Sequence, residues 1–73
     1  MEQMKILRYK FKKDSDLKAL AKNLVDNYHN ALKDGIEFES IELNVEDTDR
    51  EYQILGEIFR LDSVAYHLLD VQH

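Results

Sequence analysis

The sequence predicts a small α/β domain in which strands and helices alternate in the order βαβαβ. Two segments, 4–12 and 38–46, alternate apolar with polar side chains, as half-buried strands do. Two others, 15–34 and 49–61, carry apolar side chains at helical spacing. We therefore expect a single domain over 1–73, with a three-stranded sheet and both helices on one of its faces, in two layers. Antiparallel pairing of the strands would make the class α+β instead.

The first expected strand, 4–12, has one apolar and one basic face. The apolar face consists of Leu7, Tyr9 and Phe11. The basic face consists of Arg8, Lys10 and Lys12. A row of cations on a strand could follow the phosphates of RNA or DNA. The more ordinary interpretation is that these charges oppose Glu42 and Glu46 across the sheet.

The segment 15–34 has the clearest helical pattern in the chain. Its apolar stripe consists of Leu17, Leu20, Ala21, Leu24, Val25, Tyr28, Ala31 and Leu32. Asp14 or Ser15 can cap its first turn, and Asp16 suits the positive end of the helix dipole. Gly35 is expected in the left-handed conformation that ends many helices.

The segment 49–61 is predicted to be a second helix. Thr48 and Glu51 have the spacing of a capping box, which would start this helix. Its expected core-facing stripe consists of Tyr52, Leu55, Ile58 and Phe59, widened by Ile54 and Leu61. Its polar side consists of Arg50, Gln53, Gly56, Glu57 and Arg60.

The segment 64–71 lacks a helical stripe and is rich in β-forming residues, which predicts a third strand. Both of its faces are apolar, so either Tyr66 with Leu68 or Leu69 with Val71 should lie near the open face of the sheet. We expect an apolar patch that needs cover, and take Ile6, Tyr66 and Leu68 as its members. A homodimer through the sheet face or edge would cover it.

Charge is distributed unevenly around a net value of −5. Residues 34–62 carry ten Asp and Glu against two Arg, whereas residues 1–13 carry five Lys and Arg against one Glu. Helix initiation does not require every carboxylate near residue 48. Glu46, Asp47 and Asp49 are therefore candidates for a surface that meets a basic partner or competes for a basic nucleic-acid site.

Residue spacing argues against enzymatic chemistry. A calcium loop starting at Asp47 would need Gly at position 52 and Glu at position 58, where the chain has Tyr52 and Ile58. The histidines, at 29, 67 and 73, lack the spacing of a helical zinc site. The two glycines, Gly35 and Gly56, are too far apart for a nucleotide-binding loop. We expect no catalytic residue, metal site or cofactor.

Together these patterns predict a small acidic, non-enzymatic interaction module in the cytoplasm. Its expected partner is another protein, with self-association as one form of binding and inhibition or modulation of a larger protein as its role. The alternative is a link to nucleic acid, through an acidic competitor surface or through the basic first strand. No membrane association is expected, because the apolar runs are far shorter than a spanning helix.

Overall fold

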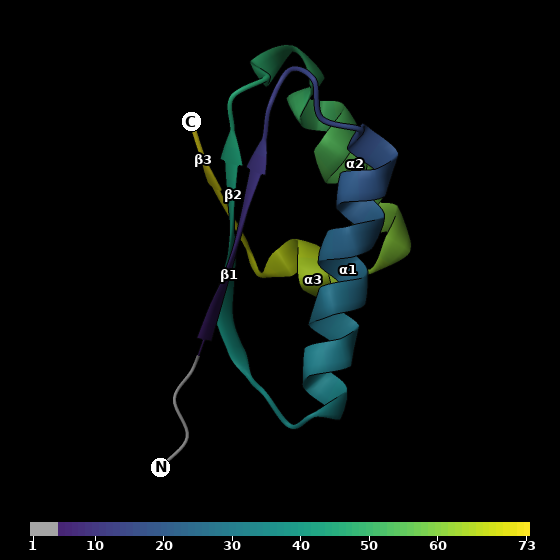
Figure 1. Cartoon of the computed structure of the whole chain (residues 1–73), viewed down its shortest axis with the longest axis vertical. Helices are drawn as coiled ribbons and strands as arrows, with labels where there is room; N and C mark the ends of the chain where they lie inside the picture. The colour runs from purple at the N-terminus through teal and green to yellow at the C-terminus, as the bar shows by residue number, and fades with distance from the viewer. Residues whose placement is uncertain (1–4) are drawn as a thin grey trace.

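Three strands, three α-helices and one 3₁₀ turn make up the described part of the chain (Figure 1). The structure is a computed structural model, and it describes residues 5–73. The elements are β1 Lys5–Phe11, α1 Leu17–Lys33, β2 Phe38–Val45, η1 Thr48–Arg50, α2 Glu51–Leu61, α3 Ser63–His67 and β3 Leu69–Gln72. The predicted first residue of β1, Met4, lies outside the described residues.

All strand pairs in the sheet are parallel, and the strand order is β1–β2–β3. Leu7 pairs with Ile41 of β2, and Ile41 pairs with Leu69 of β3. Each crossover therefore moves one strand further in the same direction, and right-handed crossovers of this kind place their helices on the same face. Figure 1 shows the helices on one side of the sheet, with the other face uncovered.

The core lies between the sheet and the helices. Its fully buried large side chains are Phe11, Leu24, Ile41, Leu43, Val45, Ile54 and Ile58. In β1 and β2 alternate residues face this core, and Leu69 and Val71 of β3 pack against it partly buried, so the opposite face is polar except for Ile6. Within residues 5–73, no helix has the length and apolar character that crossing a membrane requires.

The first helix, α1, begins and ends through local hydrogen bonds. Asp16 is its N-cap, and the Asp16 carboxylate accepts from the Ala19 amide at 3.2 Å, so neither predicted alternative caps the helix. Gly35 has a φ of +79°, the left-handed conformation expected there. The Gly35 amide donates to the Leu32 carbonyl and the Ile36 amide donates to the Ala31 carbonyl, each at 3.0 Å, which is a Schellman motif.

The predicted capping box at the start of α2 is wrong. Thr48 begins the 3₁₀ turn η1 and does not cap α2, whose N-cap is Arg50. The Glu51 carboxylate contacts Nε2 of His73 at 2.6 Å, so it is engaged away from the helix start. The turn between β2 and α2 is held by a different pair, Asp47 and Arg50, which is described below.

The first half of the predicted strand 64–71 is helical, so the element order departs from simple βαβαβ. The Asp62 carboxylate accepts from the amides of Val64 at 2.8 Å and Ala65 at 3.2 Å, which starts α3. Ala65 is fully buried in the core. These cap bonds and the burial outweigh the β-propensity of the segment, and β3 is reduced to Leu69–Gln72.

Candidate interaction surface

Two of the three side chains of the predicted basic face, Arg8 and Lys10, form separate ion pairs with carboxylates. Arg8 Nε lies 3.0 Å from Glu42 Oε1, and Lys10 Nζ lies 3.5 Å from Glu46 Oε2. Lys12 follows the end of β1 and is exposed. Arg8 and Lys10 are thus opposed by carboxylates of β2 and of the residue that follows it, as the more ordinary interpretation of the sequence predicted.

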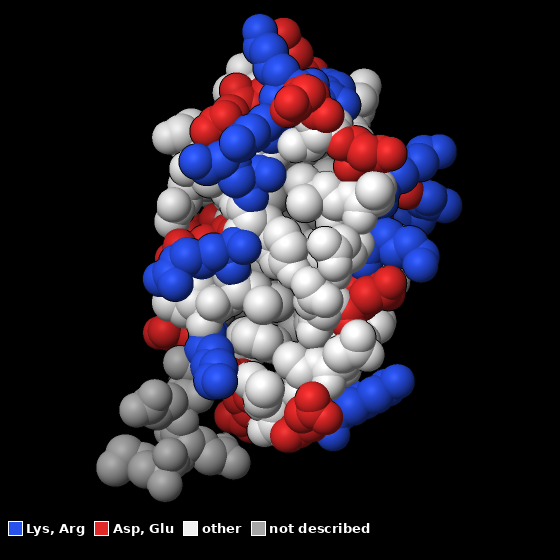
Figure 2. Space-filling model, in the orientation of Figure 1, with Lys and Arg blue, Asp and Glu red and all other residues white. Residues whose placement is uncertain are grey.

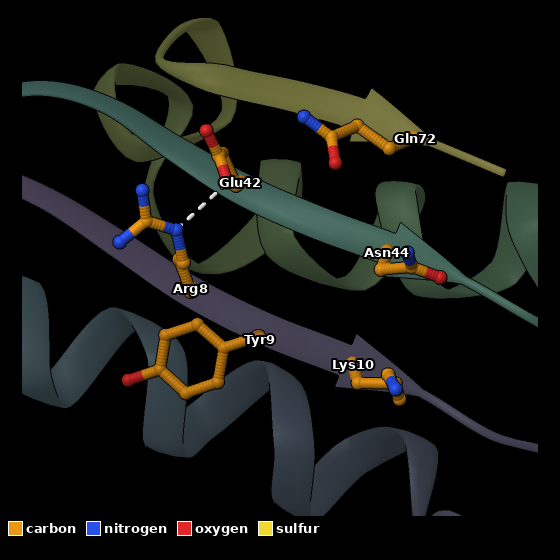
Figure 3. A pocket seen from close by; sticks show the side chains of 6 residues that line it. All are labelled: Arg8, Tyr9, Lys10, Glu42, Asn44 and Gln72. Atoms are coloured by element: carbon orange, nitrogen blue, oxygen red, sulfur yellow. Dashed lines mark hydrogen bonds and ion pairs between the residues drawn. The ribbon is translucent and has the colours of Figure 1, made fainter.

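The outer face of the sheet contains a shallow hollow of about 320 Å³. Its lining residues are Arg8, Tyr9, Lys10, Glu42, Asn44 and Gln72 (Figure 3). The Tyr9 ring lies toward α1, and its hydroxyl accepts from Asn27 Nδ2 at 2.6 Å. Figure 2 shows Lys and Arg side chains interspersed with Asp and Glu along the margins of the molecule. Because Glu42 and Glu46 pair with Arg8 and Lys10, a phosphate backbone that followed these cations would also meet carboxylates.

The three acidic candidates Glu46, Asp47 and Asp49 have different surroundings. Glu46 is exposed and pairs with Lys10. Asp47 is 5% exposed, and its carboxylate accepts from Arg50 Nε. Asp49 is exposed and makes no ion pair with any other residue in the range 5–73. One of the three carboxylates is therefore buried, and the three do not form one negative surface.

Arg50 explains why Asp47 is buried. The guanidinium of Arg50 donates through Nη2 to the carbonyls of Lys13 at 2.7 Å and Ser15 at 3.2 Å. It also lies over the Phe11 ring, 4.7 Å from the ring centroid. The Asp47–Arg50 pair thus fastens the β2–α2 turn to the β1–α1 turn, which is a structural role.

The predicted dimer patch of Ile6, Tyr66 and Leu68 is not assembled by the structure. Ile6 lies on β1 and pairs with Ser40 of β2. Tyr66 belongs to α3, and its ring packs edge-to-face against the Phe59 ring, with the two ring centroids 5.1 Å apart. Leu68 ends α3 and packs against the core. The patch was inferred from a strand 64–71 whose first half, including Tyr66, is helical in the structure.

The exposed apolar surface lies instead on α2 and α3. Tyr52 is 89% exposed and Phe59 is 52% exposed, although both were predicted to face the core. A hollow of about 370 Å³ runs along this side of α2. We define the α2–α3 apolar surface by the residues that line this hollow, which are Tyr52, Leu55, Gly56, Phe59 and Tyr66.

This surface continues to the edge of the sheet. A second hollow, of about 260 Å³, is lined by Leu55, Tyr66, His67, Leu69 and Val71. Leu55 and Tyr66 line both hollows, so the α2–α3 apolar surface and the inner side of β3 are contiguous. An apolar path therefore runs from the exposed ring of Tyr52 to the last strand.

The width of the α2 stripe was the signal that could have revealed this surface. At about 100° per residue, the apolar positions of 49–61 cover roughly half of the helix circumference. A helix that packs on one sheet buries a narrower arc. Within this apolar arc, Ile54 and Ile58 on one side are buried, whereas Tyr52 and Phe59 on the other side are exposed.

The titratable side chains near the helix ends have structural partners. His29 Nε2 contacts Asp62 Oδ2, which links α1 to the start of α3. The hydrogen bond with His29 lowers the pKa of the Asp62 carboxyl, and the Ala65 and Val64 amides lower it further against the effect of burial. Burial, followed by the negative charge of Asp62, raises the pKa of the Tyr28 hydroxyl.

No cluster in the range 5–73 brings together three or more His, Asp or Glu side chains in a way that could hold a metal ion. His67 Nδ1 contacts the Ser63 carbonyl at 2.6 Å within α3. Comparison with protein-family models, with curated proteins and with solved structures found no match.

Proposed function

We propose that this chain is a non-enzymatic protein-binding module that binds through the α2–α3 apolar surface. The observation that carries the proposal is the exposure of Tyr52 (89%) and Phe59 (52%) on one side of a single helix. Contiguous exposed apolar surface marks interaction sites on small soluble domains. Large aromatic side chains supply much of the binding free energy at protein interfaces, because each buries a large area with few rotatable bonds.

The role we propose is inhibition or modulation of a larger protein in the cytoplasm. A net charge of −5 keeps a small domain dispersed while its apolar surface is unoccupied. The α2–α3 apolar surface has a hollow beside two aromatic rings, which suits insertion of an apolar side chain from a partner.

Binding to nucleic acid has less support than binding to protein. Arg8 and Lys10 have carboxylate partners, so a phosphate would compete with Glu42 and Glu46 for them. The acidic-competitor form has less support as well, because Asp47 is committed to Arg50. Neither alternative uses the exposed aromatic rings.

The proposal is tested by affinity capture from the native host with three forms of the chain. Wild type is compared with the double variant Tyr52→Ser/Phe59→Ser and with the charge-reversed control Lys10→Glu. We expect one protein to be retained by wild type and by the control but lost by the double variant. With the purified partner, loss of one aromatic anchor worth about 2 kcal/mol weakens binding about 30-fold.

The opposite pattern would overturn the proposal. Capture that survives the double variant and is abolished by Lys10→Glu would place binding on the outer face of the sheet. A salt-dependent shift of labelled RNA or DNA that Lys10→Glu removes would then favour the nucleic-acid alternative.

A further inference from the structure

The outer edge of β3 has backbone groups that no strand pairs within residues 5–73. The Leu68 carbonyl accepts from the Ile41 amide at 2.9 Å, so this carbonyl points toward β2. Successive residues of a parallel strand direct their backbone groups to opposite sides. The N–H and C=O groups of Leu69 and Val71 therefore point away from β2, toward the free edge.

The two edges of the sheet differ in how well they resist further pairing. The β1 edge strand carries Lys5, Arg8 and Lys10, and long charged side chains are a common protection against edge-to-edge association. The β3 strand carries a single charged residue, Asp70. Although β3 is short, its edge has fewer protecting charges than the β1 edge, and it is the edge that adjoins the α2–α3 apolar surface.

One antiparallel register lets β3 pair with its own copy without a charge conflict. Directly opposed residues in a sheet have their side chains on the same face. In a symmetric antiparallel pair whose two-fold axis is perpendicular to the sheet, one residue must therefore lie directly opposite its own counterpart in the second copy. Centring on Asp70 would oppose two carboxylates. Centring on Val71 opposes Val71 to itself and Asp70 to Gln72, and it lets Val71 exchange both of its outward backbone hydrogen bonds with the second copy.

The same two-fold axis would bring the apolar surfaces together. An axis perpendicular to the sheet keeps the helices of both copies on one side of the enlarged sheet. Leu55 and Tyr66 lie beside β3 and would face their counterparts across the axis. Edge pairing and cover of the apolar surface therefore require the same arrangement.

We infer that a second copy of this chain occupies the β3 edge, in antiparallel pairing with Val71 opposite Val71 of the second copy. The inference rests on the proposed function, since the second copy would use the part of that binding surface next to β3 and would exchange there with the larger protein. Self-pairing is favoured over a foreign strand because the neutral register and the facing apolar surfaces both come from this one sequence.

The test uses single cysteines, because the chain contains none of its own. Val71→Cys should form a disulfide-linked dimer under mild oxidation, since opposed residues have Cα atoms about 5.5 Å apart. The matched control is Asp70→Cys, which lies opposite Gln72 of the second copy. The Cα atoms of the two introduced cysteines, one in each copy, would be about 8 Å apart, so this variant should form the disulfide about tenfold more slowly.

Sedimentation equilibrium of the wild-type chain accompanies the cross-linking, in case Val71→Cys fails to fold. We expect twice the mass of one chain, and we expect Val71→Lys to return it to the mass of one chain. Faster linking of Asp70→Cys, or a wild-type mass of one chain at the highest concentration, would overturn the inference. A one-chain mass combined with partner capture that needs Tyr52 and Phe59 would overturn the dimer and leave the proposed function standing.

Discussion

The apolar stripes of the two long helices, α1 and α2, differ in how far they are buried. In α1 most of the stripe is directed into the core: Ala21, Leu24, Val25 and Tyr28 are buried, and only Leu32, near the C-terminal end, is exposed. In α2 only Ile54 and Ile58 are buried, while Tyr52 on the same helix is 89% exposed. Both helices follow a parallel strand and lie against the same side of the sheet (Figure 1). The two helices therefore have the same kind of position in the fold, and they differ in how much apolar surface each leaves exposed.

A wide stripe on a helix at the sheet edge can indicate an interface in addition to a core. The β2–α2–β3 half of the molecule ends in a strand of four residues, Leu69–Gln72, so it provides little area to cover α2. Residual apolar surface at such a position is available to a second chain.

The buried halves of the two stripes should be equally important for stability. Leu24→Ala in α1 and Ile58→Ala in α2 each remove a fully buried side chain, so each should lower the free energy of unfolding by about 2–5 kcal/mol. Urea denaturation monitored by circular dichroism measures both. A cost for Ile58→Ala well below that of Leu24→Ala would mean that α2 is not packed as described.

The Asp47–Arg50 pair, which connects the turns before α1 and α2, should make the next largest contribution to the free energy of unfolding. Arg50→Met keeps an apolar contact with Phe11 but leaves the buried Asp47 carboxylate without its partner. We expect a loss of about 1–3 kcal/mol in the free energy of unfolding. Adding Asp47→Asn should recover part of that loss, because it removes the unpaired charge. A double variant less stable than Arg50→Met would contradict this role of Arg50.

The cap of α3 should contribute a smaller amount that depends on pH. Asp62→Asn weakens the cap and the contact with His29, for an expected loss of about 1 kcal/mol near neutral pH. The pKa of Asp62 is lowered in the folded state. Its charge therefore stabilises the fold above the unfolded pKa, and this stabilisation is lost as pH falls through the folded pKa.

Thermal melts of wild type and Asp62→Asn between neutral and acidic pH measure this dependence. The two melting temperatures should converge below the ordinary aspartate pKa of about 4. A difference that stays constant down to the most acidic pH would contradict the assigned origin of the shift.

The exposed half of the α2 stripe should matter least to stability. Tyr52→Ser should change the free energy of unfolding by less than about 0.5 kcal/mol, since the side chain is almost fully exposed. The matched change in α1, Tyr28→Ser, should cost about 3 kcal/mol or more. Denaturation at low protein concentration, where association is absent, gives both values, and similar costs for the two would remove the contrast between the helices.

Much of the fold could be predicted from periodicity. The alternation of β1 and β2 and the stripe of α1 are repeated over enough residues that one face of each is unambiguous. Parallel pairing follows from the alternation of strands and helices, and the structure has it in both strand pairs, so the antiparallel alternative is wrong. The structure of 63–67 was missed because one carboxylate, Asp62, starts a short helix in a segment with β-propensity.

The candidate surface was predicted less well than the fold. The opposition of Arg8 to Glu42 follows from strand pairing and could be anticipated. The burial of Asp47 could not, because it depends on Arg50 reaching carbonyls of a turn that is distant in sequence. The exposed position of Tyr52 depends on how α2 is rotated about its axis, and the apolar pattern alone allowed either half of the stripe to face the core.

We propose that a second chain covers the exposed half of the α2 stripe. Backbone amide NMR spectra of the wild-type chain, recorded from millimolar to low micromolar concentration, test it most directly. We expect concentration-dependent shifts at Tyr52, Leu55, Phe59 and along Leu69–Gln72, with Arg8 unchanged. Spectra that do not depend on concentration, or shifts confined to the outer face of β1, would contradict the claim.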